Sequence, residues 1–90
     1  MTEWDDAKNL QNIAKHGVSF ELAQRIFDGP VLTWIDDRRD YGEQREVSIG
    51  MVDGVLVLTV AHTDRSGVRR LISARPASRR ERSRYEQALR

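Results

Sequence analysis

The dipeptide Asp53-Gly54 stands between two apolar runs, and this arrangement constrains the fold more than any other part of the chain. Before it, residues 45–52 alternate between apolar and polar side chains, which is typical of a strand with two different faces. After it, a largely apolar run begins at Val55. An Asp-Gly pair between two such runs favours a two-residue type I′ turn. The sequence therefore predicts an antiparallel hairpin.

A two-residue turn also fixes which residues of the two strands face each other. The predicted pairs are Met51 with Leu56, Ile49 with Leu58, Val47 with Val60, and Arg45 with His62. This register makes one continuous apolar face that ends at the pair of Arg45 and His62.

The following turn can be built in two ways, and the choice decides which side chains of the last strand are buried. A four-residue loop over 64–67 would bury Leu71, Ser73 and Arg75. A three-residue loop over 65–67, with Gly67 left-handed, would bury Val68, Ile72 and Ala74 instead. We favour the three-residue loop because a shift by one residue exchanges the two faces, and this version keeps an arginine out of the core.

Two rows of side chains follow from this register. On the open face of the sheet, Arg69, Ser73 and Arg75 would lie beside Thr59 and Ser48 and form a positively charged strip. On the covered face, Arg70 would lie opposite His62, which in turn faces Arg45.

Three helices are predicted around these strands. The first covers residues 5–15, with Asp5 or Asp6 at its start and Gly17 after its end. The second begins at Ser19 and ends at 28–30, where the sequence is Asp-Gly-Pro. In the third, from about Arg79, the pattern of Ser78 and Glu81 is a capping box.

Together with a strand over 31–35, these elements predict an α+β fold. Two N-terminal helices would pack on one face of a four-stranded, mainly antiparallel sheet, and a basic C-terminal helix would end the chain. We interpret residues 1–90 as a single domain, since the length leaves no room for a second core.

Composition excludes several classes of protein. The chain has no cysteine, which excludes disulfide frameworks and thiolate metal sites. Its first ten residues are acidic rather than basic, and no apolar run approaches the roughly 20 residues that span a bilayer. We therefore expect an unprocessed cytoplasmic protein with no membrane partner.

The net charge of +1 conceals a strong asymmetry along the chain. Residues 1–64 carry 6 Lys and Arg against 12 Asp and Glu, whereas residues 65–90 carry 9 Arg against 2 Glu. Such asymmetry indicates binding to a polyanion or a basic interaction segment.

Several segments resemble a known family. They are WDDAKNLQNIAKHGVSFELAQRIF from Trp4, and DGVLVLTVAHTDRSGVRRLISARPASRRERSRYE from Asp53, with 15–20 and 71–75 as the most specific pieces. In order and spacing they are similar to BrnT, the toxin of a bacterial type II toxin–antitoxin module. This resemblance implies a RelE-like ribonuclease fold and an RNA-cleaving activity that inhibits translation. It also implies a BrnA-type antitoxin, through which the complex binds operator DNA. We expect no cofactor.

RNA cleavage without a metal needs a proton acceptor, a proton donor and positive charge at the phosphate. The chain has two histidines, His16 and His62. The predicted row of Arg45, His62 and Arg70 would place a histidine among cations, which lower an imidazole pKa and keep the ring neutral. The alternatives are a structural role for His62 and a helix-end role for His16.

The remaining candidates are arginines, one lysine and two tyrosines. Arg75 joins the catalytic candidates, Lys15, Arg69, Arg79 and Arg80 are RNA-binding candidates, and Arg82, Arg84 and Tyr85 are candidates for partner binding. Tyr41 is the aromatic side chain that we consider for base stacking, and capping fully explains Glu81.

Metal binding, oligomeric state and the alternatives to an enzyme complete the prediction. No spacing of acidic and histidine residues indicates a metal site, and Asp36-Asp37 is interpreted as loop. A homodimer through an exposed strand edge is a further expectation. A non-enzymatic nucleic-acid-binding regulator and a protein-interaction module remain as alternatives to an enzyme.

Overall fold

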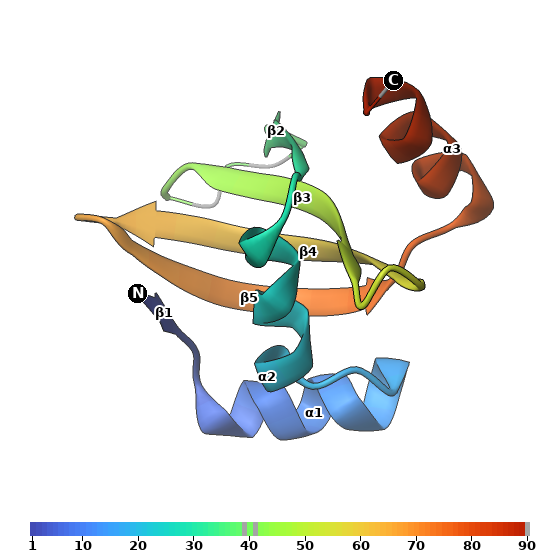
Figure 1. The fold of residues 1–90 in the computed structure, drawn as a ribbon. Coiled ribbons are helices and arrows are strands. Elements are labelled where there is room, and N and C mark those ends of the chain that lie inside the picture. Colours follow the sequence, from blue (N-terminus) through green and yellow to red (C-terminus); the bar gives the residue numbers. More distant parts are fainter. Residues whose placement is uncertain (39, 41, 90) are drawn as a thin grey trace.

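The computed structural model describes residues 1–38, 40 and 42–89, and its centre is a sheet of five strands (Figure 1). In chain order the elements are β1 (Thr2–Glu3), α1 (Asp6–His16), α2 (Phe20–Ala23), the 3-10 helix η1 (Gln24–Asp28), β2 (Leu32–Asp36), β3 (Arg45–Val52), β4 (Leu56–Arg65), β5 (Val68–Pro76) and α3 (Arg79–Ala88). The strand order is β1-β5-β4-β3-β2. The α+β class is confirmed, but the sheet has a fifth strand, β1, which pairs parallel to β5 and which the sequence analysis missed.

The predicted helix ends are confirmed by their hydrogen bonds. The Asp5 side chain accepts a hydrogen bond from the amide of Lys8, and the Ser19 hydroxyl accepts one from the amide of Leu22. Gly17 ends α1 with a φ of 72° and donates its amide to the carbonyl of Ile13. Local sequence therefore decides where these helices begin and end.

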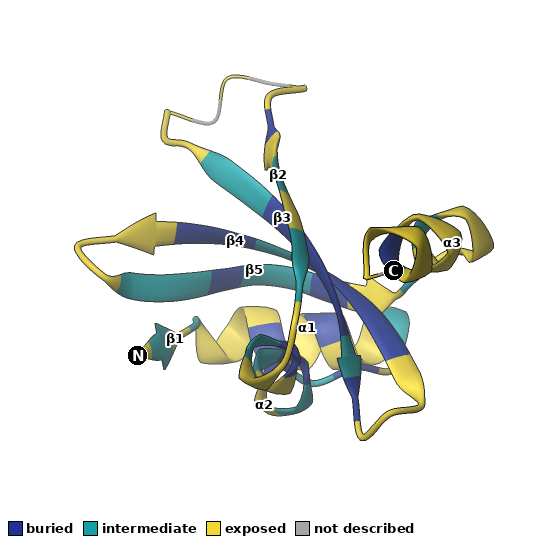
Figure 2. Ribbon diagram, turned by 45° about the horizontal axis from the view of Figure 1, so that its top comes forward, coloured by how far each residue is buried: buried dark blue, intermediate teal, exposed yellow. Residues whose placement is uncertain are grey.

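The two faces of the sheet are covered differently (Figure 2). On one face, called here the α2 face, α2 and η1 pack through Phe20 and Ile26 against Leu58, Val60 and Leu71. On the other, called the α3 face, Tyr85 packs against Ile49 and Val57. Because α3 is short, part of the α3 face stays uncovered.

Helix α1 lies along β5 with a polar side turned inward. Asn9 and Asn12 are its buried residues, whereas Leu10 is 68% exposed. The apolar residues that make α1 recognisable as a helix therefore do not form its main contact with the sheet.

The register between β3 and β4 is shifted by one residue from the prediction. Asp53 and Gly54 have φ values of 56° and 70°, as a type I′ turn requires, and the Val55 amide bonds to the carbonyl of Val52. However, pairing resumes at Val52 with Leu56, so that Val55 stays outside the ladder.

This shift moves one set of side chains to the opposite face. Ile49 lies opposite Thr59 and packs on the α3 face. The prediction had instead paired Ile49 with Leu58, which lies on the α2 face. Gly50 takes the position on the α2 face beneath η1. A Cβ atom at Gly50 would lie 2.6 Å from the Cβ of Ile26, so the close approach of η1 requires glycine there.

The turn between β4 and β5 has two residues rather than the predicted three. Ser66 and Gly67 have φ values of 53° and 83°, and Arg65 pairs with Val68. An irregularity then interrupts the ladder: His62 pairs with Leu71, but Ala61 pairs with Ser73. The extra residue is Ile72 of β5. It lets both Leu71 and Ala74 enter the core, although the prediction allowed only Ala74.

Candidate functional site

The predicted catalytic row of Arg45, His62 and Arg70 does not form. Because of the two register shifts, Arg45 lies opposite Asp36, and His62 lies opposite Glu46 and Leu71. Arg70 lies opposite Thr63, and its guanidinium group is 3.4 Å from the carboxylate of Glu3.

His62 is a core residue on the α2 face. Its side chain is 5% exposed, its Nε2 atom is 2.7 Å from the Ser48 hydroxyl, and its ring meets the edge of Phe27 at 5.2 Å. Burial, together with the positive charge of Arg69, lowers the pKa of His62 to about 4. The ring is thus neutral near pH 7 but is enclosed by protein, which corrects its placement beside a bound RNA.

Arg69 also lies on the α2 face, not on the open face where the sequence analysis placed it. Its guanidinium carbon is 3.6 Å from the centre of the Phe27 ring, a cation–π contact. Arg69 therefore covers the side of the core that contains His62.

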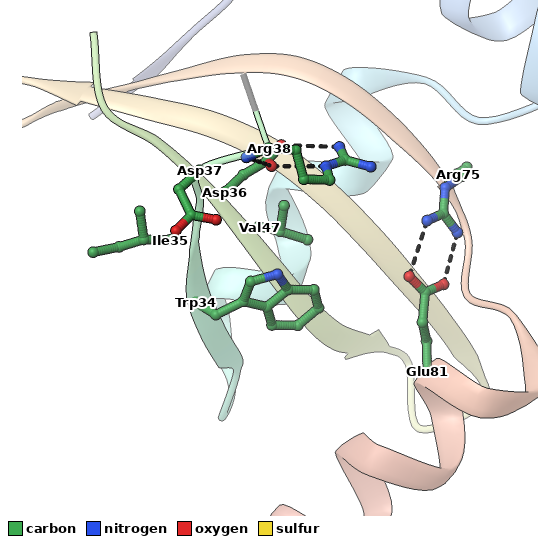
Figure 3. A pocket seen from close by; sticks show the side chains of 8 residues that line it. All are labelled: Trp34, Ile35, Asp36, Asp37, Arg38, Val47, Arg75 and Glu81. Carbon is green, nitrogen blue, oxygen red and sulfur yellow. Dashed lines mark hydrogen bonds and ion pairs between the residues drawn. The ribbon is translucent and has the colours of Figure 1, made fainter. Parts of the chain in front are cut away.

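The uncovered part of the α3 face holds a pocket of about 210 Å³. It lies between the end of β2, β3, β5 and the start of α3, and Figure 3 shows its side chains. Two opposite sides of the pocket are each lined by an ion pair: Asp36 with Arg38 on one side, and Arg75 with Glu81 on the other. Val47 and Trp34 lie between the two ion pairs. Of the predicted catalytic residues, only Arg75 lines this pocket.

Arg75 and Glu81 form a bidentate ion pair. The two guanidinium nitrogens of Arg75 lie 2.7 Å and 2.9 Å from the two carboxylate oxygens of Glu81. Thr59, which lies opposite Arg75, donates its hydroxyl to the same carboxylate at 3.2 Å, and the Ser78 amide donates at 2.9 Å. The capping box therefore also fixes Glu81 in the pocket.

These hydrogen bonds set the charges at this side of the pocket. The Arg75 guanidinium, followed by the Ser78 amide and the Thr59 hydroxyl, lowers the pKa of Glu81 to about 2. The hydrogen bond to Glu81 in turn raises the pKa of Arg75. Glu81 is therefore an ionised carboxylate at neutral pH, able to accept a proton but not to donate one.

The opposite side of the pocket is built by Asp36 and Arg38. Two guanidinium nitrogens of Arg38 donate to the two carboxylate oxygens of Asp36 over 2.8 Å and 2.9 Å. The Asp36 side chain is 3% exposed, whereas that of Arg38 is 79% exposed. This arrangement presents a guanidinium group at the mouth of the pocket. Nothing in the sequence indicated this ion pair, because Asp36 and Arg38 looked like loop residues.

Helix α3 carries the remaining predicted residues and is anchored more firmly than expected. Tyr85 is buried, and its hydroxyl donates to the carbonyl of Pro30 at 2.9 Å, which corrects its assignment to partner binding. The Arg84 guanidinium carbon lies 5.3 Å from the centre of the Trp34 ring. Arg79, Arg80, Arg82 and Arg84 are all exposed. Tyr41 lies outside the described residues.

Lys15 and His16 lie at the end of α1, in a second hollow beside β5 and apart from the pocket. Among the residues that the structure describes, no group of three or more His, Asp or Glu side chains is placed to hold a metal ion. Within the same residues, no helix is long and apolar enough to cross a membrane.

Comparison with known proteins identifies relatives of the chain. Residues 4–81 match the family model described as the ribonuclease toxin BrnT of type II toxin–antitoxin systems. The fold is similar to the crystal structure of the ribonuclease toxin BrnT from Brucella abortus, with a TM-score of 0.65 and 29% sequence identity. This similarity covers 88% of the present chain and 99% of the Brucella chain. Comparison with curated proteins gave no match.

Proposed function

The chain belongs to the BrnT family of ribonuclease toxins of type II toxin–antitoxin systems, and from this premise we propose that it is a metal-independent endoribonuclease with its active site at Arg75 and Glu81. Membership implies an RNA target and an antitoxin partner. The observation that carries the proposal is the bidentate Arg75–Glu81 pair in an open pocket of the sheet.

The proposed reaction uses the 2′-hydroxyl of RNA as the nucleophile. Its oxygen attacks the adjacent phosphorus, the bond from phosphorus to the 5′-oxygen breaks, and a 2′,3′-cyclic phosphate remains. Arg75 binds the phosphate oxygens and stabilises the charge that develops on the phosphorane. Glu81 accepts the proton of the 2′-hydroxyl, and the leaving 5′-oxygen takes a proton from water.

A pKa of about 2 makes Glu81 a weak base in the free protein. A phosphate bound at Arg75 changes this, because it competes for the guanidinium N–H groups and brings a negative charge close to the carboxylate. Both effects raise a carboxyl pKa. We therefore infer that the substrate itself moves Glu81 toward the range in which proton transfer is efficient.

The chemistry is tested with purified protein and a 5′-labelled RNA in the presence of EDTA. We expect new RNA fragments whose 3′ ends carry a 2′,3′-cyclic phosphate. Cleavage that stops in EDTA and returns with added Mg²⁺ would contradict a metal-independent mechanism. RNA that binds but keeps its original ends would instead indicate a nucleic-acid-binding regulator.

The proposal extends to translation and to the partner. We propose that cleavage of RNA inhibits translation in the bacterial cytoplasm and that a BrnA-type antitoxin neutralises the enzyme and brings the complex to operator DNA. Arg79, Arg80 and Arg82 expose guanidinium groups on α3 for an acidic surface of that antitoxin. A RelE-like fold and a homodimer stay predictions. Growth arrest upon expression, relieved by co-expression of the antitoxin, tests this part.

A further inference from the structure

A second hollow, of about 250 Å³, lies on the side of β5 that faces α1. Its polar lining comes from Lys8, Gln11, Asn12, Lys15 and His16 on α1 and from Ser73 on β5. We call this hollow the lysine groove.

Both lysines of the chain line this one groove. Lys8 and Lys15 are seven residues apart, which is about two turns of α-helix, so they project from the same side of α1. Neither lysine makes an ion pair within the part of the chain that the structure describes. By contrast, Arg70 and Arg75 face the carboxylates of Glu3 and Glu81. Among the described residues, the lysine groove therefore presents two cations that have no ion-pair partner.

Helix stability explains only part of this charge. Lys15 and His16 lie in the last turn of α1, where a positive charge interacts favourably with the helix dipole. Lys8 lies in the first turn, where the dipole disfavours a cation. Its position is thus unfavourable for the helix by itself, which points to a role in binding an anion.

The lysine groove adjoins the proposed active site through β5. Ser73 and Arg75 flank Ala74 in the strand and pair with Ala61 and Thr59, so they lie on the same face. Two residues along a strand span about 6.6 Å. Ser73 reaches the lysine groove and Arg75 reaches the pocket, so one polymer chain can contact both by crossing β5.

We propose that the lysine groove is a second phosphate-binding site, which holds the RNA backbone on the far side of β5 while Arg75 holds the phosphate that is cleaved. This inference rests on the proposed function. Lys8 and Lys15 would contact phosphate oxygens as point charges, and the Ser73 hydroxyl and Gln11 amide would donate hydrogen bonds. The site adds affinity without base specificity, because it contacts the backbone alone.

The chemistry of the groove favours RNA over a protein partner. Protein interfaces centre on apolar or aromatic anchors, whereas Ile72 is the single large apolar residue in this lining. The exposed large apolar side chains of α1, Leu10 and Ile13, do not line the groove. A polyanion matches a cationic, polar lining directly.

The test measures binding of a fluorescent 12-nucleotide RNA in which every 2′-hydroxyl is methylated, so that it cannot be cleaved. Affinity is measured by anisotropy from low to moderate salt for the wild type and for the double variant Lys8→Gln, Lys15→Gln. The control is Arg25→Gln, Arg65→Gln, which removes the same charge from two exposed ion pairs elsewhere.

We expect the lysine variant to weaken binding several-fold and to make the slope of log affinity against log salt shallower by about 1.4, or about 0.7 for each lost phosphate contact. The control should keep the wild-type slope. A trinucleotide that reaches only the Arg75 pocket should bind the wild type and the lysine variant equally. Thermal unfolding of both variants checks that they are folded.

Several outcomes separate this inference from the proposed function. If the lysine variant keeps the wild-type salt slope while the wild type cleaves RNA, the phosphate-binding role of the lysine groove is contradicted and the proposed enzymatic function stands. If the salt slope depends on the lysines but the wild type does not cleave RNA, the phosphate-binding role of the groove is supported and the proposed enzymatic function is contradicted. Unchanged RNA binding together with lost antitoxin binding overturns the proposal in favour of a protein-docking site.

Discussion

The side chain of Asn12 pairs with both backbone groups of Ala74. Its amide nitrogen donates to the Ala74 carbonyl at 2.7 Å, and its amide oxygen accepts from the Ala74 nitrogen at 3.1 Å. The Asn12 amide thus takes the place of a neighbouring strand at an edge that β1 is too short to cover. Since Ala74 lies between Ser73 and Arg75, this contact holds the part of β5 that carries both proposed phosphate sites.

Replacing Asn12 by Ala should lower the free energy of unfolding by about 3 kcal/mol. The change leaves a buried backbone N–H and C=O of Ala74 without their partner, and it also removes the hydrogen bond to the Val18 carbonyl. Urea unfolding measures the effect. Gln11→Ala, at an exposed neighbouring position, is the control and should change stability by less than about 0.5 kcal/mol. Equal stability of the two variants would contradict the edge-closing role.

Glu81→Gln should reduce RNA cleavage by about 100-fold or more, because the amide cannot accept the proton of the 2′-hydroxyl. Arg75→Ala should reduce it by a similar factor through loss of phosphate binding. Rates of single-turnover cleavage measure both effects.

The control for Glu81 separates catalysis from helix capping. Ser78→Ala removes the hydroxyl that caps the Glu81 amide and should cost about 1 kcal/mol of stability, with cleavage retained. If Glu81→Gln loses stability but still cleaves RNA at the wild-type rate, Glu81 is a capping residue alone.

His62 should make the stability of the protein depend on pH between about 4 and 6.5. The folded-state pKa of His62 is about 4, below its ordinary value of 6.5, so the unfolded chain binds more protons across this interval. Stability is therefore fully present above pH 6.5 and falls as the pH is lowered toward 4, by up to about 3 kcal/mol.

Urea unfolding at a series of pH values measures this fall. His62→Gln should flatten the stability profile over the interval, while His16→Gln should keep the decline that His62 causes. A profile of His62→Gln that is parallel to the wild type would show that His62 does not titrate as its burial requires.

Gly50→Ala should lower stability by about 1–3 kcal/mol, the usual cost of overpacking. The added methyl group would meet the Cβ of Ile26 at 2.6 Å and a methyl group of Val31 at 3.1 Å. Ile26→Ala keeps its Cβ atom, so this second change should not rescue the variant. Gly29→Ala is the matched control, since nothing lies within 4 Å of the added atom there. Thermal unfolding compares the four proteins.

Local signals in the sequence located most elements. Asp5, Ser19 and Ser78 each accept the helix-starting hydrogen bond that was expected of them, and the turn at Asp53-Gly54 has the expected dihedral angles. These predictions hold because a cap or a tight turn involves only a few consecutive residues, whose conformational preferences do not depend on the rest of the fold.

The faces of the strands could not be predicted in the same way. A single unpaired residue, Val55 in the first hairpin or Ile72 in the second, exchanges the side chains that follow between the two faces. Since the sheet is packed on both faces, apolar side chains occur on each of them, and hydrophobicity alone does not indicate which face a residue occupies. The predicted row of Arg45, His62 and Arg70 failed for this reason.

The sequence by itself determined the starts of the helices, the four antiparallel strands, the turn at Asp53-Gly54 and the family of this protein. The tertiary structure alone decided which charged residues meet. Glu81 reaches Arg75 because Tyr85 fixes α3 against Pro30 and the sheet. The two lysines face Ser73 because the buried asparagines turn α1 toward β5. Such contacts join residues far apart in the chain or on different elements, and their geometry is set by packing rather than by local preference.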